Sequence, residues 1–231
     1  MEAEHGPLWA AFLRALSDLI APGVRVMDLG CNRGGLLAVL AGGYEKMWSG
    51  VQPGLAVGVE IDTAPMRALL RAVPPRSDVL FTTAGPRSFP GQFDLVLSHE
   101  VVYLLPDLTE VFADLHEALV DGGYVCITTG GHVENPLYER WRSALTRSGV
   151  RAQPYRETDY EESLRGAGFG KLRRERLLLT EDEYDRWVST RPERAPNPDW
   201  FPSAAEERRY YVGFGKPIFI AQRAVGDGSA P

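Results

Sequence analysis

The sequence predicts an α/β protein built on a doubly wound, mostly parallel sheet. Short apolar runs of strand length alternate with stretches of helical apolar spacing over most of the chain. This alternation is typical of βαβ units, which place helices on both faces of one sheet. Glycine and polar residues also gather just after the apolar runs, and an open α/β sheet binds its ligand there, beyond the carboxyl ends of its strands.

The composition excludes several classes of protein. The 231 residues include 31 acidic and 25 basic side chains, with a formal charge of −6, and 44% are hydrophobic, which is typical of a folded globular protein and not of a disordered one. Net acidity without a long basic run argues against nucleic acid as a partner. The two cysteines, Cys31 and Cys126, are too far apart for a CxxC metal site, so we predict no metal.

The amino-terminal residues carry no secretory or membrane signal. Acidic residues precede the first apolar stretch, where a secretory signal would be basic. No apolar run approaches the roughly 18 residues that are needed to span a bilayer. We therefore predict a cytoplasmic protein that does not bind membranes.

The first half of the chain supplies an N-terminal helix and four strands. Apolar residues recur at helical spacing from Pro7 to Ile20, and Pro7 suits a first helical turn. Each apolar run that follows is short and most are bounded by glycine or proline, as buried strands are. We expect strands over 24–29, 55–61, 77–83 and 92–98, and helices from 36 onward, over 63–73 and over 104–120.

The second half continues the alternation. Gly122 and Gly123 are expected to end the helix over 104–120, because glycine tolerates the left-handed conformation found at helix ends. We expect strands over 124–129, 171–179 and 210–223, and helices over 136–148 and 157–167.

The turn after the first strand carries a recognisable motif. Residues 26–34 read Val-Met-Asp-Leu-Gly-Cys-Asn-Arg-Gly, which resembles motif I of the class I S-adenosylmethionine-dependent methyltransferases. Asp28, Gly30 and Gly34 fill that motif, and Asn32 replaces its middle glycine. Glycine lets the backbone turn tightly and approach the amino-acid end of the donor without a Cβ in the way. Asparagine tolerates left-handed dihedrals, so the turn is expected to survive.

The second strand ends in a carboxylate, Glu60. A carboxylate at this position can accept both ribose hydroxyls of a nucleoside ligand, and the resemblance implies that role for Glu60. The resemblance also implies donor contacts for Ile61, Thr83 and Ser98, with Thr83 where the family usually has an acidic residue near the adenine. Glu60 could instead cap the next helix, and Asp28 could instead hold the turn through backbone N–H groups.

The fourth and fifth strands deliver the candidate bases. Residues 93–98 (FDLVLS) and the Gly-Gly pair before the fifth strand resemble the later methyltransferase motifs. His99 follows the fourth strand, near where the methyl group would be presented, and His132 follows the fifth. A base is needed only if the nucleophile arrives protonated. The alternative for His99 is that it fixes the loop by hydrogen bonds.

Residues 180–209 exceed a simple hairpin between the last two strands. This insertion holds Tyr184, Trp187, Trp200 and Phe201 beside a proline-rich stretch. Aromatic residues in a long insertion next to a site suggest a cover for the substrate. A packed lid over an edge of the core is the equal alternative.

The resemblance covers about residues 20–180 and implies a Rossmann-like methyltransferase fold, with a mostly parallel seven-stranded sheet whose last strand is antiparallel. We predict one domain over residues 1–231, with an N-terminal helix cap over 1–21 and a flexible tail over 226–231. The protein is expected to be a monomer or a homodimer.

The predicted function is methyl transfer from S-adenosylmethionine to an oxygen or nitrogen nucleophile of a small-molecule metabolite, such as a natural-product intermediate. One alternative is a donor-binding protein of the same fold with a non-methylating or accessory role. Another is a nicotinamide-dependent oxidoreductase. The spacing Gly30-x-x-x-Gly34-Gly35 disfavours the oxidoreductase, because it lacks the G-x-G-x-x-G pattern that close approach to a pyrophosphate requires.

Overall fold

The computed structural model describes residues 5–43, 50–72, 78–191 and 195–225. Seven strands form one sheet in the order β3-β2-β1-β4-β5-β7-β6. Neighbours from β3 to β5 pair in parallel, whereas β7 is antiparallel to both β5 and β6. This arrangement confirms the predicted fold class. The strands are β1 Arg25–Leu29, β2 Leu55–Val59, β3 Val79–Thr82, β4 Phe93–His99, β5 Leu119–Thr128, β6 Phe169–Leu177 and β7 Lys216–Arg223.

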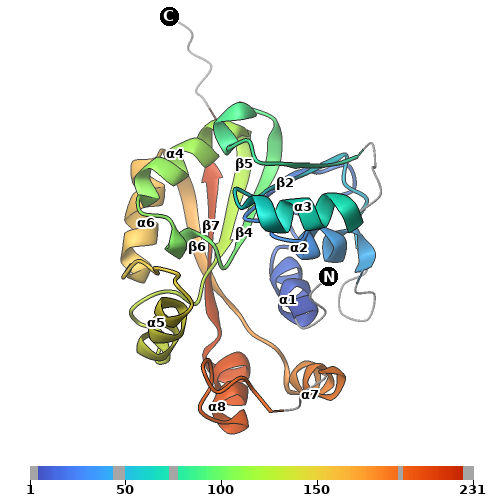
Figure 1. Ribbon diagram of the computed structural model, residues 1–231. Coiled ribbons are helices and arrows are strands. Elements are labelled where there is room, and N and C mark those ends of the chain that lie inside the picture. Colours follow the sequence, from blue (N-terminus) through green and yellow to red (C-terminus); the bar gives the residue numbers. More distant parts are fainter. Residues whose placement is uncertain (1–4, 44–49, 73–77, 192–194, 226–231) are drawn as a thin grey trace, which may run out of the picture.

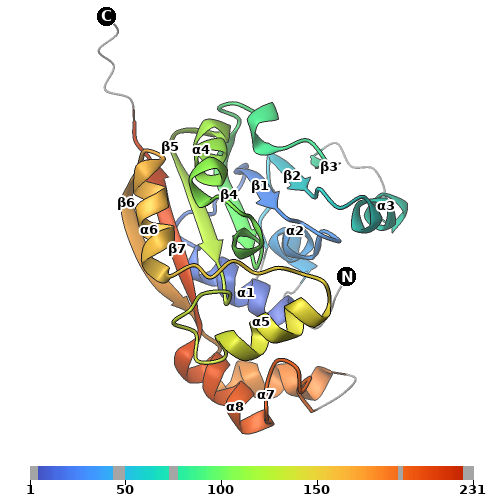
Figure 2. The ribbon, with the colours of Figure 1, turned by 60° about the vertical axis from the view of Figure 1, so that its left-hand side comes forward.

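Helices cover both faces of the sheet, and a further group lies beyond one end of it. The helices are α1 Gly6–Ala15, α2 Gly35–Ala38, α3 Thr63–Ala72, α4 Leu108–Ala118, α5 Tyr138–Arg147, α6 Glu157–Gly166, α7 Glu181–Thr190 and α8 Ala204–Arg208. Figure 1 shows α1 and α2 on one side of the sheet and α4 and α6 on the other. Figures 1 and 2 both place α5, α7 and α8 beyond the carboxyl ends of the parallel strands.

The two faces of the sheet form two apolar layers because successive strand residues point to opposite sides. In β1, Val26 packs with α1 and α2, and Met27 packs with α4 and α6. In β7, Ile218 and Ile220 join the first layer, and Phe219 joins the second. The strand bodies are therefore buried on both sides, as expected for a sheet covered by helices.

The expected end of the fourth helix is wrong. Helix α4 ends at Ala118, and Leu119 is already extended and pairs with Phe93 of β4. Gly122 and Gly123 lie inside β5, where the register with β4 shifts between the pairs Phe93–Leu119 and Leu95–Tyr124. Gly122 has φ of +79°, so its left-handed conformation serves a bulge in the strand and not a helix end.

The expected start of the last strand is also wrong. Residues Arg209–Phe214 form a π-helical segment, and β7 begins only at Lys216. Gly215 has φ of +70° and closes this segment, and a Cβ at Gly215 would lie 2.5 Å from the carbonyl oxygen of Leu177. The residues directly before β7 are therefore helical from Ala204 to Phe214, and Gly215 alone separates them from the strand.

The expected tail over 226–231 lies outside the described residues, as do residues 44–49 before β2. The single-domain organisation of residues 1–231 stays a prediction. Among the described residues, no helix is both long and apolar enough to cross a membrane.

Candidate active site

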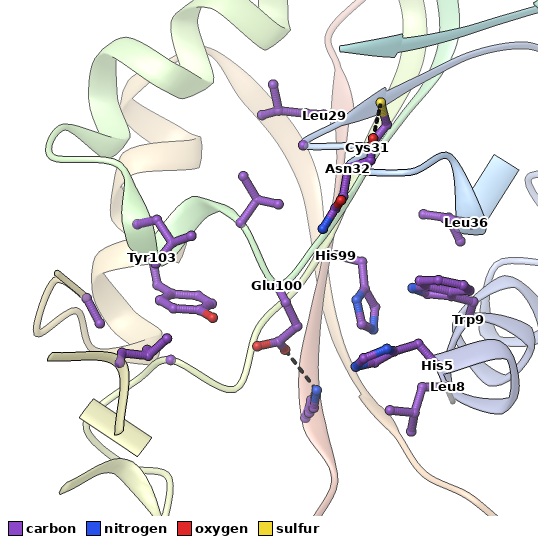
Figure 3. A pocket seen from close by; sticks show the side chains of 18 of the residues that line it. His5, Leu8, Trp9, Leu29, Cys31, Asn32, Leu36, His99, Glu100 and Tyr103 are labelled. Atoms are coloured by element: carbon purple, nitrogen blue, oxygen red, sulfur yellow. Dashed lines mark hydrogen bonds and ion pairs between the residues drawn. The ribbon is translucent and has the colours of Figure 1, made fainter. Parts of the chain in front are cut away.

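A cavity of about 1120 Å³ opens at the carboxyl ends of β1, β2 and β4. The turn after β1 and the residues after β2 line one part of it, and residues of α5, α7 and the segment before β7 line another. Figure 3 shows His99, Glu100, Trp9 and Asn32 around its middle. One cavity thus joins the predicted donor turn to the aromatic insertion.

The turn after β1 has the backbone that the motif requires. Gly30, Asn32 and Gly34 all have positive φ, of +74°, +45° and +72°. Asn32 therefore adopts the left-handed conformation that was expected of it. A Cβ at Gly30 would lie 2.3 Å from Cγ2 of Val101 in the loop after β4. Position 30 therefore requires glycine for two reasons: its dihedrals are left-handed, and the loop after β4 leaves no room for a Cβ.

Glu60 joins the turn after β1 to the loop after β2. Its Oε2 accepts a hydrogen bond from the backbone N–H of Asn32 at 3.0 Å, and its Oε1 accepts one from the N–H of Asp62 at 2.9 Å. Each carboxylate oxygen has a further lone pair for another donor, and Glu60 lines the cavity. The neighbouring Ile61 side chain is 71% exposed and lines the same part.

Asp28 is a buried carboxyl group at the base of the turn. Its side chain is 2% exposed, and its Oδ2 has no hydrogen-bond partner among the described residues. Burial and then the nearby charge of Glu60 raise the pKa of Asp28 to about 7. A buried carboxyl without a partner is uphill to ionise, so a cation beside it would restore the charged form.

We expect Asp28 to make the ligand-free protein less stable as the pH rises from about 4 to about 7. In that window the folded Asp28 still holds a proton that the unfolded chain has lost, because its pKa is about 7 when folded and 3.8 ordinarily. The folded state then binds more protons, so its stability falls with rising pH. Urea unfolding at several pH values measures the slope, and the Asp28→Asn variant should lose this contribution. Identical pH slopes in the two proteins would contradict the assignment.

His99 stands at the end of β4 and lines the cavity. Its ring lies 6.0 Å from the ring of Phe12 and 6.4 Å from that of Trp9, and Figure 3 shows His5 beside it. Burial, then the charges of Lys216 and His5, holds the pKa of His99 well below its ordinary value. The imidazole is therefore neutral at pH 7. Its Nε2 is buried without a hydrogen-bond partner among the described residues.

An ion pair between a buried ammonium and a partly exposed carboxylate lines the cavity, and neither of its members was given a role from the sequence. The ammonium of Lys216 lies 3.1 Å from Oε1 of Glu100, and Glu100 also accepts a hydrogen bond from the N–H of Gly130 at 2.7 Å. Glu100 has φ of +62°, which is uncommon for a residue with a Cβ. The position of Glu100 directly after His99, at the end of β4, could have marked it as a site residue. Nothing in the sequence near Lys216 marks that lysine as its partner.

Four of the predicted residues do not line the cavity, namely Gly34 in the turn after β1, Ser98, Thr83 and His132. Ser98 is buried, and its hydroxyl donates to the carbonyl of Leu29 at 3.2 Å, so it ties β4 to β1. Thr83 is exposed, just beyond the end of β3. His132 is fully buried with its Nδ1 3.3 Å from Glu134 and 3.6 Å from Glu157. Burial lowers the pKa of His132 although both carboxylates oppose that shift.

The aromatic insertion packs around the far part of the cavity. Aromatic residues that line it are Trp141, Trp187, Trp200, Phe201 and Tyr211. The ring of Trp141 meets those of Trp200 and Phe201 edge to face, at 5.9 and 5.8 Å. The insertion therefore packs against α5 and also faces the cavity, and its role as a cover for the substrate stays a prediction.

The cysteines do not supply a reactive thiolate. Both are free and buried, and burial raises the pKa of each thiol far above its usual range. Within the described parts of the chain, no cluster of three histidine, cysteine or acidic residues is placed to hold a metal ion.

A glycine turn after β1, a carboxylate after β2 and this strand order together define the class of Rossmann-like methyltransferases. The family model described as a methyltransferase domain matches residues 2–173, and the chain belongs to this S-adenosylmethionine-dependent family. The resemblance carried by the sequence motifs is thereby confirmed.

Two curated relatives share about 30% identity with the chain. It is 32% identical over 144 residues to nocamycin O-methyltransferase of Saccharothrix syringae, covering 59% of this chain and 49% of that protein. It is 30% identical over 141 residues to carboxy-S-adenosyl-L-methionine synthase of a Psychrobacter strain, covering 58% and 51%. The chain thus spans about half the length of the curated relatives it matches.

A solved structure also resembles the chain, a complex of the Haloferax volcanii Trm112 methyltransferase activator with a methyltransferase. The TM-score is 0.71 at 18% identity, over 95% of this chain and 92% of that one. At this identity the likeness concerns the fold alone.

Proposed function

We propose that the protein transfers a methyl group from S-adenosylmethionine to an oxygen or nitrogen nucleophile of a small-molecule metabolite. The observation that carries the proposal is the single cavity that runs from the glycine turn and Glu60 to the aromatic insertion. Donor and acceptor must share one enclosed space for a direct transfer, and here one space has a donor side and an apolar side.

The residues of the donor side fit the donor's chemistry. The carboxylate of Glu60 would accept the ribose hydroxyls, and the exposed apolar side chain of Ile61 would cover the adenine. The backbone of Gly30 and Asn32 would face the amino-acid end. The unpartnered Oδ2 of Asp28 is an acceptor suited to a cationic ligand. Together these groups would place a positively charged donor next to the two carboxyl groups, Asp28 and Glu60, that line this side of the cavity.

Methyl transfer requires mainly that the donor and the acceptor are aligned and that water is excluded from the reacting atoms. The bound donor supplies an activated methyl group for an in-line displacement. Holding two reactants in line is worth roughly 7 to 11 kcal/mol, and the aromatic wall of the insertion would exclude water from the reacting atoms. His99 is neutral and lines the cavity, so it is the candidate base for a hydroxyl or an ammonium nucleophile, and it would need a bound ligand to raise its lowered pKa. His132 lies outside the cavity lining, so we assign it no contact with the acceptor.

The donor site is tested by Glu60→Ala. We expect this variant to bind S-adenosylhomocysteine about 10- to 150-fold more weakly, because charge-assisted hydrogen bonds contribute roughly 1.5 to 3 kcal/mol. Isothermal titration calorimetry measures the affinity. Glu162→Gln, which alters an exposed carboxylate on α6, is the matched control and should bind normally. Unchanged affinity in Glu60→Ala would remove its ribose role, and tight NADH binding without S-adenosylhomocysteine binding would overturn the proposed function.

A second candidate function has support from one relative. The similarity to carboxy-S-adenosyl-L-methionine synthase favours a protein that binds the donor without methylating an acceptor. Mass spectrometry of reaction mixtures distinguishes the two: methyl transfer yields S-adenosylhomocysteine and a methylated product, whereas the second function leaves the donor intact or carboxylated. The cytoplasmic location and the monomeric or homodimeric state stay predictions.

A further inference from the structure

Arg191 directly follows α7, at the wall of the cavity formed by the insertion. Its guanidinium carbon lies 3.9 Å from the centre of the Trp187 ring, and its side chain is 10% exposed. Its Nη1 donates to both oxygens of Glu207, at 2.9 and 3.1 Å. The guanidinium is therefore fixed in place by stacking on one side and by a carboxylate at one corner.

The other edge of this guanidinium has no partner. Nε and Nη2 are buried and make no hydrogen bond with the described residues. These two nitrogens form one planar edge with two parallel N–H groups, which is the fork that binds a carboxylate through both of its oxygens. Buried donors of a charged group are costly to leave unpaired. Arg191 thus holds a pair of unpartnered donors, fixed by its neighbours, just beneath the surface of the cavity that this residue lines.

The surroundings of this edge define the ligand's charge and shape. Arg191 and Glu207 together carry no net charge, and neither do Lys216 and Glu100, which are paired on the same cavity. A singly charged group is therefore accommodated better than a doubly charged phosphate. Trp187, Trp200 and Tyr211 line the cavity as well, and their ring faces and edges favour a flat apolar body.

We propose that Arg191 determines specificity by binding a carboxylate of the methyl acceptor through Nε and Nη2. The acceptor is accordingly an organic monocarboxylate with a flat, apolar body. This inference rests on the proposed function, since it assigns the insertion side of the cavity to the acceptor. A purely structural arginine would need only its contacts to Trp187 and Glu207 and would not discriminate among ligands.

The test uses 1-naphthoate and its neutral analogue 1-naphthamide as probes. Calorimetric titration into the full chain, with and without saturating S-adenosylhomocysteine, should give at least a tenfold tighter affinity for 1-naphthoate. In Arg191→Met this preference should vanish, with a 10- to 100-fold loss for 1-naphthoate and unchanged S-adenosylhomocysteine affinity. Arg191→Lys keeps the charge without the fork and should lose most of the preference. Arg186→Met, an exposed arginine of the same helix, should behave as the wild type.

Several results would overturn the inference. These are equal affinity for the two probes, no saturable binding of 1-naphthoate, tighter binding of 1-naphthyl phosphate, or an unchanged preference in Arg191→Met. If Arg191→Met does not fold, Glu207→Gln decides: it keeps the fork and removes the competing charge, so 1-naphthoate binding should be kept or strengthened, and its loss would refute the inference. Failure of S-adenosylhomocysteine to bind the wild type would instead count against the proposed function, while the probe comparison without it still tests Arg191.

Discussion

Replacing Lys216 by methionine is expected to destabilise the folded protein by roughly 1 to 3 kcal/mol, because the carboxylate of Glu100, whose side chain is 22% exposed, loses its cationic partner. The Lys216 side chain is 6% exposed and its ammonium lies 3.1 Å from Glu100. Glu100 cannot readily turn away, because its carboxylate also accepts the N–H of Gly130. Without the lysine a carboxylate would stay in the cavity wall with one backbone donor. Urea unfolding at pH 7 measures the loss.

Two further variants isolate this pair. Adding Glu100→Gln to Lys216→Met should recover much of the lost stability, because removal of both charges leaves no uncompensated carboxylate. Lys171→Met alters an exposed lysine of β6 and should change the free energy of unfolding little. If Lys216→Met is as stable as the wild type, the ion pair does not contribute to stability as argued.

Gly30→Ala is expected to cost roughly 2 to 6 kcal/mol and to abolish tight donor binding. Two penalties combine: a left-handed φ of +74°, and a Cβ placed 2.3 Å from Cγ2 of Val101. Backbone strain of this kind and overpacking each cost roughly 1 to 3 kcal/mol. Relief of the overlap would push the turn after β1 away from the loop after β4. Chemical denaturation and titration with S-adenosylhomocysteine measure the two effects.

The two penalties at Gly30 can be separated with matched variants. Gly23 has φ of +82°, and a Cβ added there would meet no atom within 4 Å, so Gly23→Ala should show the strain alone and keep donor affinity. Val101→Ala removes the two methyl groups nearest to the new Cβ, so Gly30→Ala should be less harmful in that background. Equal losses in Gly23→Ala and Gly30→Ala would show that the contact between the loops is unimportant.

The part of the cavity that we assign to the donor could largely be predicted from the sequence. Asp28, Gly30, Asn32 and Glu60 lie at the ends of two neighbouring strands, and residues at the carboxyl ends of parallel strands share one edge of a sheet. Asn32 adopts the left-handed conformation expected for a residue in a glycine position. The motif turn can be predicted because its requirement, a backbone without steric hindrance, is local.

The ends of helices and strands were harder to predict from the sequence where strand pairing in the folded protein overrides the local conformational preference of the residues. The pair Gly122-Gly123 is a good helix end by its residues alone, but pairing of Leu119 with Phe93 begins the strand earlier and turns Gly122 into a bulge. The segment before Lys216 is apolar enough to be a strand. Tyr210 and Tyr211 instead bury their rings among the aromatic residues of the insertion, which keeps the segment helical.

The sequence by itself determined the sheet, its order of elements and the glycine turn that we assign to the donor, since apolar periodicity and glycine requirements act over a few neighbouring residues. Only the tertiary structure decided the part of the cavity that we assign to the acceptor. The pairs Glu100–Lys216 and Arg191–Glu207 join residues from separate segments. An ion pair between residues that are distant in the sequence produces no periodic pattern of residue types. It can therefore be identified only from the folded structure, in which the strands and the insertion line one cavity.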